Sequence, residues 1–344
     1  MMNSRSWMER DQPNALNFIR LVSALAVLFA HSWAFGKFGV DPLSGLLIRW
    51  NAGDLAGNAV NAFFIISGFL ITGSWLSGRR AESFLRARVV RIWPAYAVAF
   101  ILSAFIAALA AGDAWLQYLR SIPKQSWFVG IFTLDPFELE RALSFADNPY
   151  PRTVNGPMWT IRIEFCCYMA VALAGSVGVL RRRWLVVLFT AFAIALAAYE
   201  HAFVPNAWMR WSRFASFFGA GSLLYLYKEY IPRSGWIAGG CLFACFTCNY
   251  LPPDVIIPPA FTYLLFYAAY SAPEWMKVIG SRNDISYGVY LYGGVLQQLY
   301  YAYAIRGYLP MSPWINFAAV LPICILLGWL SWLYIERPAK AWMR

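Results

Sequence analysis

The stretch from Asn17 to His31 combines an apolar helix pattern with two side chains that could carry out chemistry. Arg20 and His31 are eleven residues apart. At 3.6 residues per turn this spacing places them near one face of a helix, roughly 16 Å apart along its axis. In a membrane-spanning helix, Arg20 would lie near the entry and His31 roughly halfway through the bilayer. Ionisable groups at that depth usually mark a functional site. The alternative is structural: His31 bonds to a neighbouring helix and Arg20 extends to the lipid headgroups.

His31 is one of two histidines in the chain. An imidazole exchanges protons near neutral pH, so His31 could activate a hydroxyl nucleophile as a general base. It could also accept an acyl group as a transient covalent carrier. The second histidine, His201, falls in what we expect to be a short outer loop, and we interpret it as a surface residue.

Glu164 lies in the apolar stretch MWTIRIEFCCY, four residues before Tyr168. This spacing places the two side chains on one helical face, whereas Arg162 points elsewhere. A buried carboxylate needs a partner, and a histidine or arginine on another span is the natural one. Glu164 could therefore orient an imidazole, as the acid of a catalytic triad does. Alternatively, it forms a salt bridge that only fixes helix packing.

Arg88 and Arg91 lie three residues apart at the start of an apolar stretch, after a basic loop. Guanidinium groups bind phosphate oxygens through paired hydrogen bonds. Basic residues in such a loop also act as topology signals, which is our interpretation of Arg79 and Arg80. Because Arg88 and Arg91 lie so close to the span, we favour ligand binding for them.

The composition indicates an all-α, polytopic membrane protein. Hydrophobic residues make up 60% of the chain, aromatic residues 18% and charged residues only 13%. These values are too apolar for a soluble core within a polar surface. The net charge of +11 is spread over short loops. It therefore lacks the clustered basic face of a nucleic-acid-binding protein. Cys241, Cys245 and Cys248 share a helical face without a neighbouring histidine or carboxylate, so we expect no metal site.

About ten apolar stretches are long enough to cross a membrane as helices. They run near residues 17–36, 55–77, 92–112, 157–179, 184–200, 211–227, 235–250, 256–272, 285–305 and 314–335. Lys and Arg number 18 in the segments on one side and 9 on the other. The excess predicts that both termini are cytoplasmic. We expect one domain over residues 1–344 in the cytoplasmic (inner) membrane, with the first stretch kept as an anchor and not cleaved as a signal peptide.

The longest connection, about Gly112 to Gly156, would then face outside. It contains several prolines together with acidic and aromatic residues, namely Trp115, Trp127, Asp135, Glu138, Glu140 and Asp147. This combination suits carbohydrate binding. An ordered loop at a membrane surface would have the same composition, so both interpretations stay open.

Six motifs along the chain, in order, resemble those of the membrane acyltransferase-3 family. They are the Arg20-x10-His31 helix, the Gly57–Leu70 segment ending in SGFL, RVVRIWPAY at Arg88–Tyr96, Trp159-x4-Glu164-x3-Tyr168, ISYGVYLY at Ile285–Tyr292 and YIERP at Tyr334–Pro338. The resemblance covers nearly the whole chain. The chain departs from the family pattern in three places. Thr160-Ile161 replaces Ser-Leu, and Arg162 is an extra charge. Gly293 stands where many relatives have histidine, and this difference puts in doubt any mechanism that needs a second intramembrane histidine.

The resemblance implies transfer of an acyl group, commonly acetyl from acetyl-CoA, to a hydroxyl of a carbohydrate acceptor such as a cell-envelope glycan. We predict a membrane O-acyltransferase in which His31 is the general base or acyl carrier and Glu164 orients or compensates it. Arg20, Arg88 and Arg91 would hold the CoA phosphates. Four further residues would line the passage, namely Ser67, Trp159, Tyr168 and Tyr287. The expected partners are acyl-CoA, a glycan or lipid-linked glycan, and membrane lipids, with no nucleic acid and no metal.

Two other functions fit the same sequence. A transporter or flippase of a lipid-linked glycan would use these polar residues to line a path and would consume no acyl-CoA. A non-catalytic membrane scaffold would tolerate loss of Arg20 or Glu164. The presence of an arginine and a histidine on one face of a membrane helix argues against the scaffold.

Overall fold

The computed structural model is all-α over the residues that it describes, 6–9, 12–50, 52–78, 80–142, 144–204, 211–247, 253–281 and 283–342. The chain divides into two compact units. The first comprises Met1–Arg20, Gly45–Leu85 and Ile163–Arg282, and the second comprises Leu21–Ser44, Arg86–Arg162 and Asn283–Arg344. The unit boundaries fall inside α1 (Leu16–Gly36), α2 (Pro42–Arg49), α4 (Ala81–Ala110) and α7 (Trp159–Ser176).

The first unit is built around the close packing of two helices. Its remaining helices are α3 (Leu55–Leu76), α8 (Arg183–Phe203), α9 (Trp211–Leu226), α10 (Gly235–Thr247), α11 (Pro253–Ser271) and α12 (Glu274–Val278). A side chain at Gly68 of α3 would overlap the α9 backbone at Phe218, and one at Gly221 of α9 would overlap α3. Thr72 Oγ1 donates across this contact to Ser222 Oγ at 2.9 Å. Small residues therefore let α3 and α9 approach closely, as they do in membrane helix pairs.

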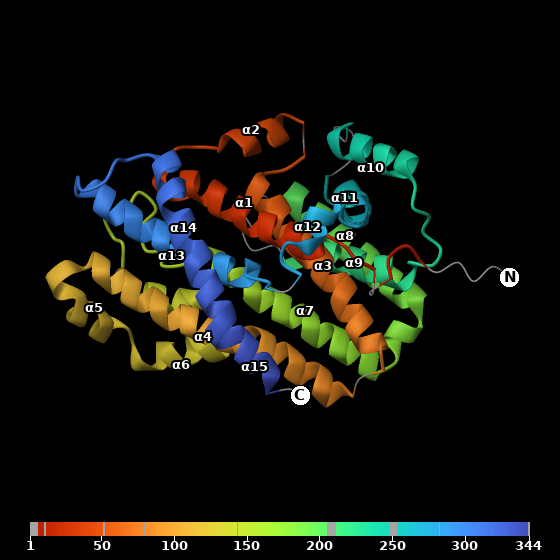
Figure 1. Ribbon diagram of the computed structural model, residues 1–344, viewed down its shortest axis with the longest axis horizontal. Helices are drawn as coiled ribbons and strands as arrows, with labels where there is room; N and C mark the ends of the chain where they lie inside the picture. The colour runs from red at the N-terminus through yellow and green to blue at the C-terminus, as the bar shows by residue number, and fades with distance from the viewer. Residues whose placement is uncertain are drawn as a thin grey trace. The chain divides into compact units, whose positions relative to one another are not determined.

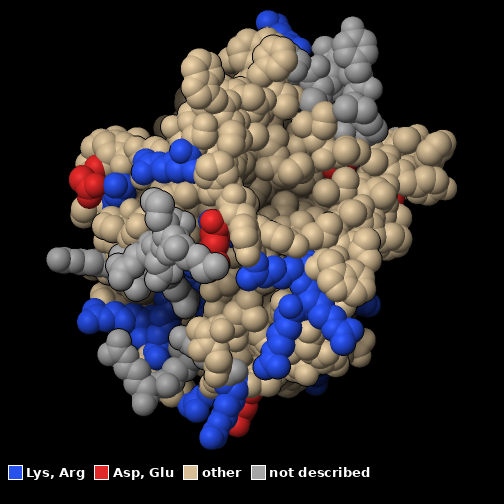
Figure 2. All heavy atoms as spheres, turned by 90° about the vertical axis from the view of Figure 1, so that its right-hand side faces the viewer, with Lys and Arg blue, Asp and Glu red and all other residues tan. Residues whose placement is uncertain are grey.

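Basic turns lie together at one end of this unit. The side chain of Arg183, at the start of α8, lies over the rings of Tyr227 and Tyr230, at 5.7 and 5.8 Å from their centres. The connection before α8 and the connection after α9 are therefore neighbours, and both are predicted to be cytoplasmic. On the face drawn in Figure 2, Lys and Arg side chains outnumber Asp and Glu. Arg79, which we interpret as a topology signal, lies outside the described residues.

The second unit is organised around α13. Its remaining helical elements are α5 (Trp115–Ser121), α6 (Lys124–Phe132), α13 (Ser286–Ile305), α14 (Pro313–Ser331), the π-helical turn η5 (Trp332–Glu336) and α15 (Arg337–Ala341). α13 is buried at most of its positions. It runs beside α14 (Figure 1), where a Cβ added at Gly288 would lie 2.6 Å from Gly328 Cα. The two glycines thus permit a close helix contact.

The connection predicted as a loop from Gly112 to Gly156 is partly helical, because it contains α5, α6 and short 3-10 turns. Its last part is fixed to α13 by side-chain amides. Asn148 Nδ2 donates to both the carbonyl and the side-chain oxygen of Gln298 at 2.8 Å. Gln298 Nε2 in turn donates to the carbonyls of Tyr150 and Thr153. The sequence did not show these contacts, since it gives no pairing between a loop and a helix 150 residues away.

Six described helices are long and apolar enough to cross a membrane: Leu16–Gly36, Leu55–Leu76, Ala81–Ala110, Gly156–Ser176, Arg183–Phe203 and Pro313–Ala341. The chain is therefore a multi-pass membrane protein. The other four predicted spans also form helices, α9, α10, α11 and α13, but these are shorter or less apolar. The total of ten and the cytoplasmic placement of both termini stay predictions.

Candidate active site

His31 lies on α1 in the second unit, five residues before the helix ends at Gly36. It therefore lies in the last third of this helix. Its Nδ1 lies 2.8 Å from the carbonyl oxygen of Val27. A carbonyl can only accept, so in the neutral ring Nδ1 carries the proton and Nε2 is the basic nitrogen. This is the tautomer that a general base needs.

A cavity of about 10 Å³ lies beside His31. That volume is close to the room needed by one water molecule. Its lining comes from α1, from α13 through Tyr290, Gly293, Gly294 and Gln297, and from Pro157. A Cβ at Gly293 would lie 2.9 Å from Leu28 Cδ1. Gly293 thus borders the same cavity as His31. A side chain at this position would come too close to Leu28 unless Leu28 moved.

Two buried amide side chains, Gln297 at this cavity and Asn155 near Gly294, have oxygens without a hydrogen-bond partner among the described residues. Gln297 is fully buried, and its Nε2 donates to Leu28 O at 2.6 Å and to Ser32 Oγ at 2.7 Å, but Oε1 is unpartnered. Asn155 Nδ2 donates to Leu291 O at 2.7 Å, and its Oδ1 is also unpartnered. A buried acceptor left unpaired costs about 1–3 kcal/mol. Such oxygens are therefore candidates for binding a substrate hydroxyl or water.

Gln297 and Asn155 are not among the site residues predicted from the sequence. The available signal was the pair of glutamines within the otherwise apolar stretch at residues 285–305, which resembles a polar seam inside a membrane helix. Asn155 gave no comparable signal, because it belongs to a connection where polar residues are common.

A pair of hydroxyl groups lies next to the cavity, since Tyr290 is also one of its lining residues. Tyr290 OH is 2.7 Å from Thr160 Oγ1 and donates to Pro157 O at 2.8 Å. Thr160, which replaces the family's serine, therefore keeps a hydroxyl in a buried hydrogen bond. Trp159, predicted to line the passage, begins α7 directly after the 3-10 turn Gly156–Met158.

Glu164 lies in the first unit and joins α7 to α3. Its Oε1 accepts hydrogen bonds from Ser67 Oγ, at 2.6 Å, and from Tyr168 OH. The structure thus brings together three predicted site residues and confirms that Glu164 and Tyr168 share a helical face. Hydrogen bonds to a carboxylate are among the stronger ones in proteins. We call these three residues the Glu164 cluster.

The predicted phosphate ligands differ in their surroundings. Arg91 forms ion pairs with Asp284 at 2.9 Å and with Glu336 at 3.2 Å. Its guanidinium also lies 5.5 Å from the ring centre of Tyr287, whose hydroxyl donates to Ile92 O at 3.2 Å. A phosphate would have to compete with two carboxylates for Arg91. The structure therefore gives Arg91 and Tyr287 packing roles that the sequence did not reveal.

Arg20, in the first unit, has its guanidinium 6.0 Å from the ring centre of Phe63. Arg88 lies one turn before Arg91 on α4 and is partly buried. The unusual charge of Arg162 lies in the first turn of α7, half exposed, where it pairs with Asp135 at 3.3 Å. It is therefore an ion pair near the helix start and not an isolated charge in a span.

His201 and the group of cysteines are not part of the candidate active site. His201 is exposed, as predicted, although it lies in the last turn of α8 and pairs with Asp254 at 3.0 Å. Cys248 lies outside the described residues. Within the described part of the chain, no group of three or more His, Cys, Asp or Glu side chains is arranged to hold a metal ion.

The sequence model of an acyltransferase domain matches residues 14–333 of the chain. This chain belongs to the acyltransferase-3 family. The match covers α1 through α14, so it includes His31, Glu164 and every other predicted site residue.

Two full-length relatives agree with this assignment. The chain is similar to nodulation protein 10 of Rhizobium leguminosarum bv. viciae, with 28% identity over 95% of this chain and 93% of the relative. It is also similar to an O-acetyl transferase of Shigella phage Sf6, with 24% identity over 94% of this chain and 95% of the relative. No solved structure matches the chain. The family and these relatives support a membrane O-acyltransferase.

Proposed function

We propose that this acyltransferase moves an acyl group, most simply acetyl, from cytosolic acyl-CoA to a hydroxyl of a cell-envelope glycan. The observation that carries the proposal is the state of His31. Its Nδ1 is committed to Val27 O, which leaves Nε2 as the base, and the ring borders a cavity with an unpartnered amide oxygen. A general base next to a buried hydroxyl-binding group is the minimum apparatus for O-acylation.

The proposed reaction begins when His31 Nε2 takes the proton of the acceptor hydroxyl. The acceptor oxygen then bonds to the thioester carbonyl carbon, and the carbon–sulfur bond breaks. The CoA thiolate that leaves receives the proton from the imidazolium, so the reaction releases free CoA and an ester. In the alternative order, Nε2 attacks the thioester first and passes the acyl group to the hydroxyl. Both orders require His31.

Gln297 gives the acceptor a place to bind. Its Oε1 accepts but cannot donate, so it suits a second hydroxyl of the acceptor sugar, next to the reacting hydroxyl whose proton goes to His31 Nε2. Since Nε2 of the same amide is held by Leu28 O and Ser32 Oγ, the orientation of Oε1 is fixed. A fixed acceptor lowers the entropy lost when the hydroxyl is aligned for reaction.

Arg20, Arg88 and Arg91 stay our candidates for the CoA phosphates. Arg91 is already paired with two carboxylates, so among the three we assign it the smallest direct share. We propose that Glu164 serves catalysis from within its own cluster, where Ser67 and Tyr168 donate hydrogen bonds to its Oε1. Trp159 and Tyr287 stay weaker candidates for the passage.

The test is an assay of purified protein in lipid nanodiscs with acetyl-CoA and a cell-envelope glycan. We expect release of free CoA thiol that depends on the glycan, with a matching acetyl gain measured by mass spectrometry. Glycan movement across the bilayer without CoA release would contradict the proposal and favour the flippase.

A further inference from the structure

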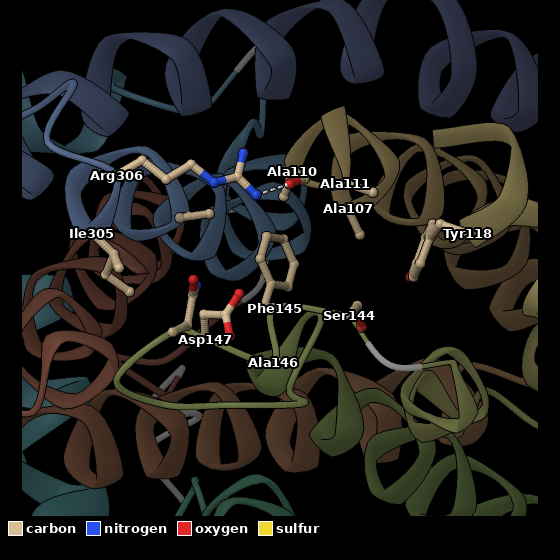
Figure 3. Close-up of a pocket in the computed structure, with 12 residues that line it drawn as sticks. Ala107, Ala110, Ala111, Tyr118, Ser144, Phe145, Ala146, Asp147, Ile305 and Arg306 are labelled. Carbon is tan, nitrogen blue, oxygen red and sulfur yellow. Dashed lines mark hydrogen bonds between the residues drawn. The ribbon is translucent and has the colours of Figure 1, made fainter. Parts of the chain in front are cut away.

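A pocket lies in the second unit, where α4 and α13 end (Figure 3). Its volume is about 270 Å³. Alanines of α4 form one wall (Figure 3). Five larger residues of α5, of the segment 144–148 and directly after α13 also line the pocket, namely Tyr118, Phe145, Asp147, Asn148 and Arg306. Pockets for drug-sized ligands hold roughly 300–1,000 Å³. This one therefore suits a single small ring.

The pocket is built into the fold. Arg306 donates to the carbonyl of Ala110 at the end of α4, and Asn148 is held by Gln298 of α13. Phe145 has a φ of 50°, a conformation that residues other than glycine seldom adopt. Strained residues persist where the surrounding contacts hold them, and they concentrate at functional sites. The pocket wall is therefore fixed before any ligand binds.

The lining combines groups that recognise a sugar. Asp147 is exposed and accepts hydrogen bonds, whereas Arg306 has guanidinium N–H groups to donate. The hydroxyls of Tyr118 and Ser144 are buried and lie next to each other at the pocket. Sugar hydroxyls both donate and accept, so they match such a mixed set, and the ring of Phe145 offers an apolar face for sugar C–H groups. One carboxylate and one guanidinium balance in charge, which favours a neutral sugar over a phosphate.

The pocket and the His31 cavity share one helix. Gln297 of α13 borders the cavity, whereas Ala302 of α13 and Arg306, directly after this helix, border the pocket. At ~1.5 Å rise per residue, these positions lie roughly 8 and 13 Å beyond Gln297 along the helix axis. A sugar in the pocket is thus beyond direct reach of His31 Nε2, whereas a neighbouring sugar of the same glycan can extend toward it.

We propose that this pocket is a subsite for one neutral pyranose residue of the acceptor glycan, next to the residue that is acylated. The proposal rests on the proposed acyl transfer to a glycan. It gives Asp147 of the predicted outer loop a specific task. The subsite selects the sugar that precedes or follows the acylated one, and so sets the position of the ester along the glycan.

The test measures binding of methyl hexopyranosides (glucoside, galactoside and mannoside) to the full-length protein in nanodiscs by saturation-transfer difference NMR. We expect at least one to bind. Asp147→Ala should weaken its binding by about tenfold, since it removes hydrogen bonds to a charged acceptor. Ala111→Phe should abolish binding by filling the pocket. The matched controls are Asp113→Ala, which removes another exposed carboxylate of the same unit, and Ala114→Phe, and both should bind as the wild type does.

The outcomes separate the two proposals. His31→Ala should bind the probe normally while transfer is lost. If the probe binds but the wild type releases no CoA, acyl transfer is wrong and the sugar site stands. If the wild type acylates glycan while no methyl hexopyranoside binds, the subsite is overturned. It is also overturned if Asp147→Ala and Ala111→Phe leave probe binding and the KM for glycan unchanged.

Discussion

The Glu164 cluster and the His31 cavity are both polar sites among apolar helices, but they differ in how completely their groups are paired. In the cluster, one carboxylate oxygen accepts from Ser67 and from Tyr168, and these partners come from α3 and α7. At the cavity, the side-chain oxygen of Gln297 has no partner among the described residues. The first site resembles a closed structural network and the second a site prepared for a ligand.

This difference separates two kinds of buried polar residue. A saturated network rigidifies the protein, and its loss is felt mainly as instability. An unsaturated site carries a free-energy cost in the folded protein, which a bound hydroxyl or water can offset. Arg91, held by Asp284 and Glu336, belongs with the saturated group. Variants at both kinds of site therefore test the comparison.

The largest effect on stability is expected for Arg91→Gln. The change removes the cation that pairs with Asp284 and Glu336, and removing one partner of a buried ion pair costs about 3–5 kcal/mol. We expect a clearly lower unfolding temperature in detergent. Arg86→Gln is the control, since Arg86 is exposed and donates one hydrogen bond to Trp342 O. If Arg91→Gln is as stable as Arg86→Gln and instead raises the KM for acyl-CoA, Arg91 is a phosphate ligand after all.

The next effect is expected for Glu164→Leu. It leaves the hydroxyls of Ser67 and Tyr168 without their acceptor, which should lower the free energy of unfolding by about 2–4 kcal/mol. Glu164→Gln keeps an acceptor oxygen and should cost about 1 kcal/mol. Thermal unfolding of both variants provides the measurement. Equal stability of the two would show that the cluster is not a saturated network.

A smaller change in stability, but a clear loss of activity, is expected at the cavity. Gln297→Leu removes two donated hydrogen bonds and also the unpartnered oxygen, so the opposing effects should leave stability within about 1 kcal/mol of the wild type. Acyl transfer should fall about tenfold or more, as expected for loss of a substrate hydrogen bond. The adjacent Gln298→Leu is the contrasting variant.

Gln298 fixes the segment that contains Tyr150 and Thr153, so its loss should destabilise the protein by about 1–3 kcal/mol. Unfolding curves and transfer rates of the two glutamine variants would be compared side by side. A Gln297 variant that is unstable yet fully active would reverse our assignment of the cavity.

The smallest effect concerns pH and lies outside both sites. Burial raises the pKa of Glu140 to about 7, although hydrogen bonds from Thr153 and Val154 act in the opposite direction. Because the folded protein binds this proton more tightly than the unfolded chain, the contribution to stability is present at acidic pH and is lost as pH rises through about 7. Glu140→Gln should make the unfolding temperature less dependent on pH between 5 and 8, by roughly one to a few degrees. An unchanged pH profile would count against a buried, protonated Glu140.

The sequence predicted what depends on local spacing and on composition. The helix that carries Arg20 and His31 and the shared face of Glu164 and Tyr168 follow from 3.6 residues per turn, and both are present. The apolar stretches gave helices at all ten predicted positions. Membrane crossing is supported for six of them, because length and hydropathy together decide only the clearest cases.

The sequence could not predict contacts between distant segments. The ion pair of Arg91 with Asp284 spans 193 residues, and nothing near Arg91 in the sequence indicates it. The charge of Arg91 therefore favoured a phosphate ligand, although carboxylates already surround it. Likewise, the role of Gln297 depends on its distance from Leu28 and Ser32 in another helix. The role of a positive charge or of an amide side chain can be assigned only when its neighbours in the structure are known.

The central claim is that His31 Nε2 carries out the transfer. It is tested most directly by the rate of acetyl transfer from labelled acetyl-CoA to glycan for His31→Ala, with His201→Ala as the control for loss of an exposed histidine. We predict that His31→Ala loses about 100-fold or more of the rate while its unfolding temperature stays near the wild-type value, and that His201→Ala stays active. Transfer by folded His31→Ala at a rate close to that of His201→Ala would contradict the account.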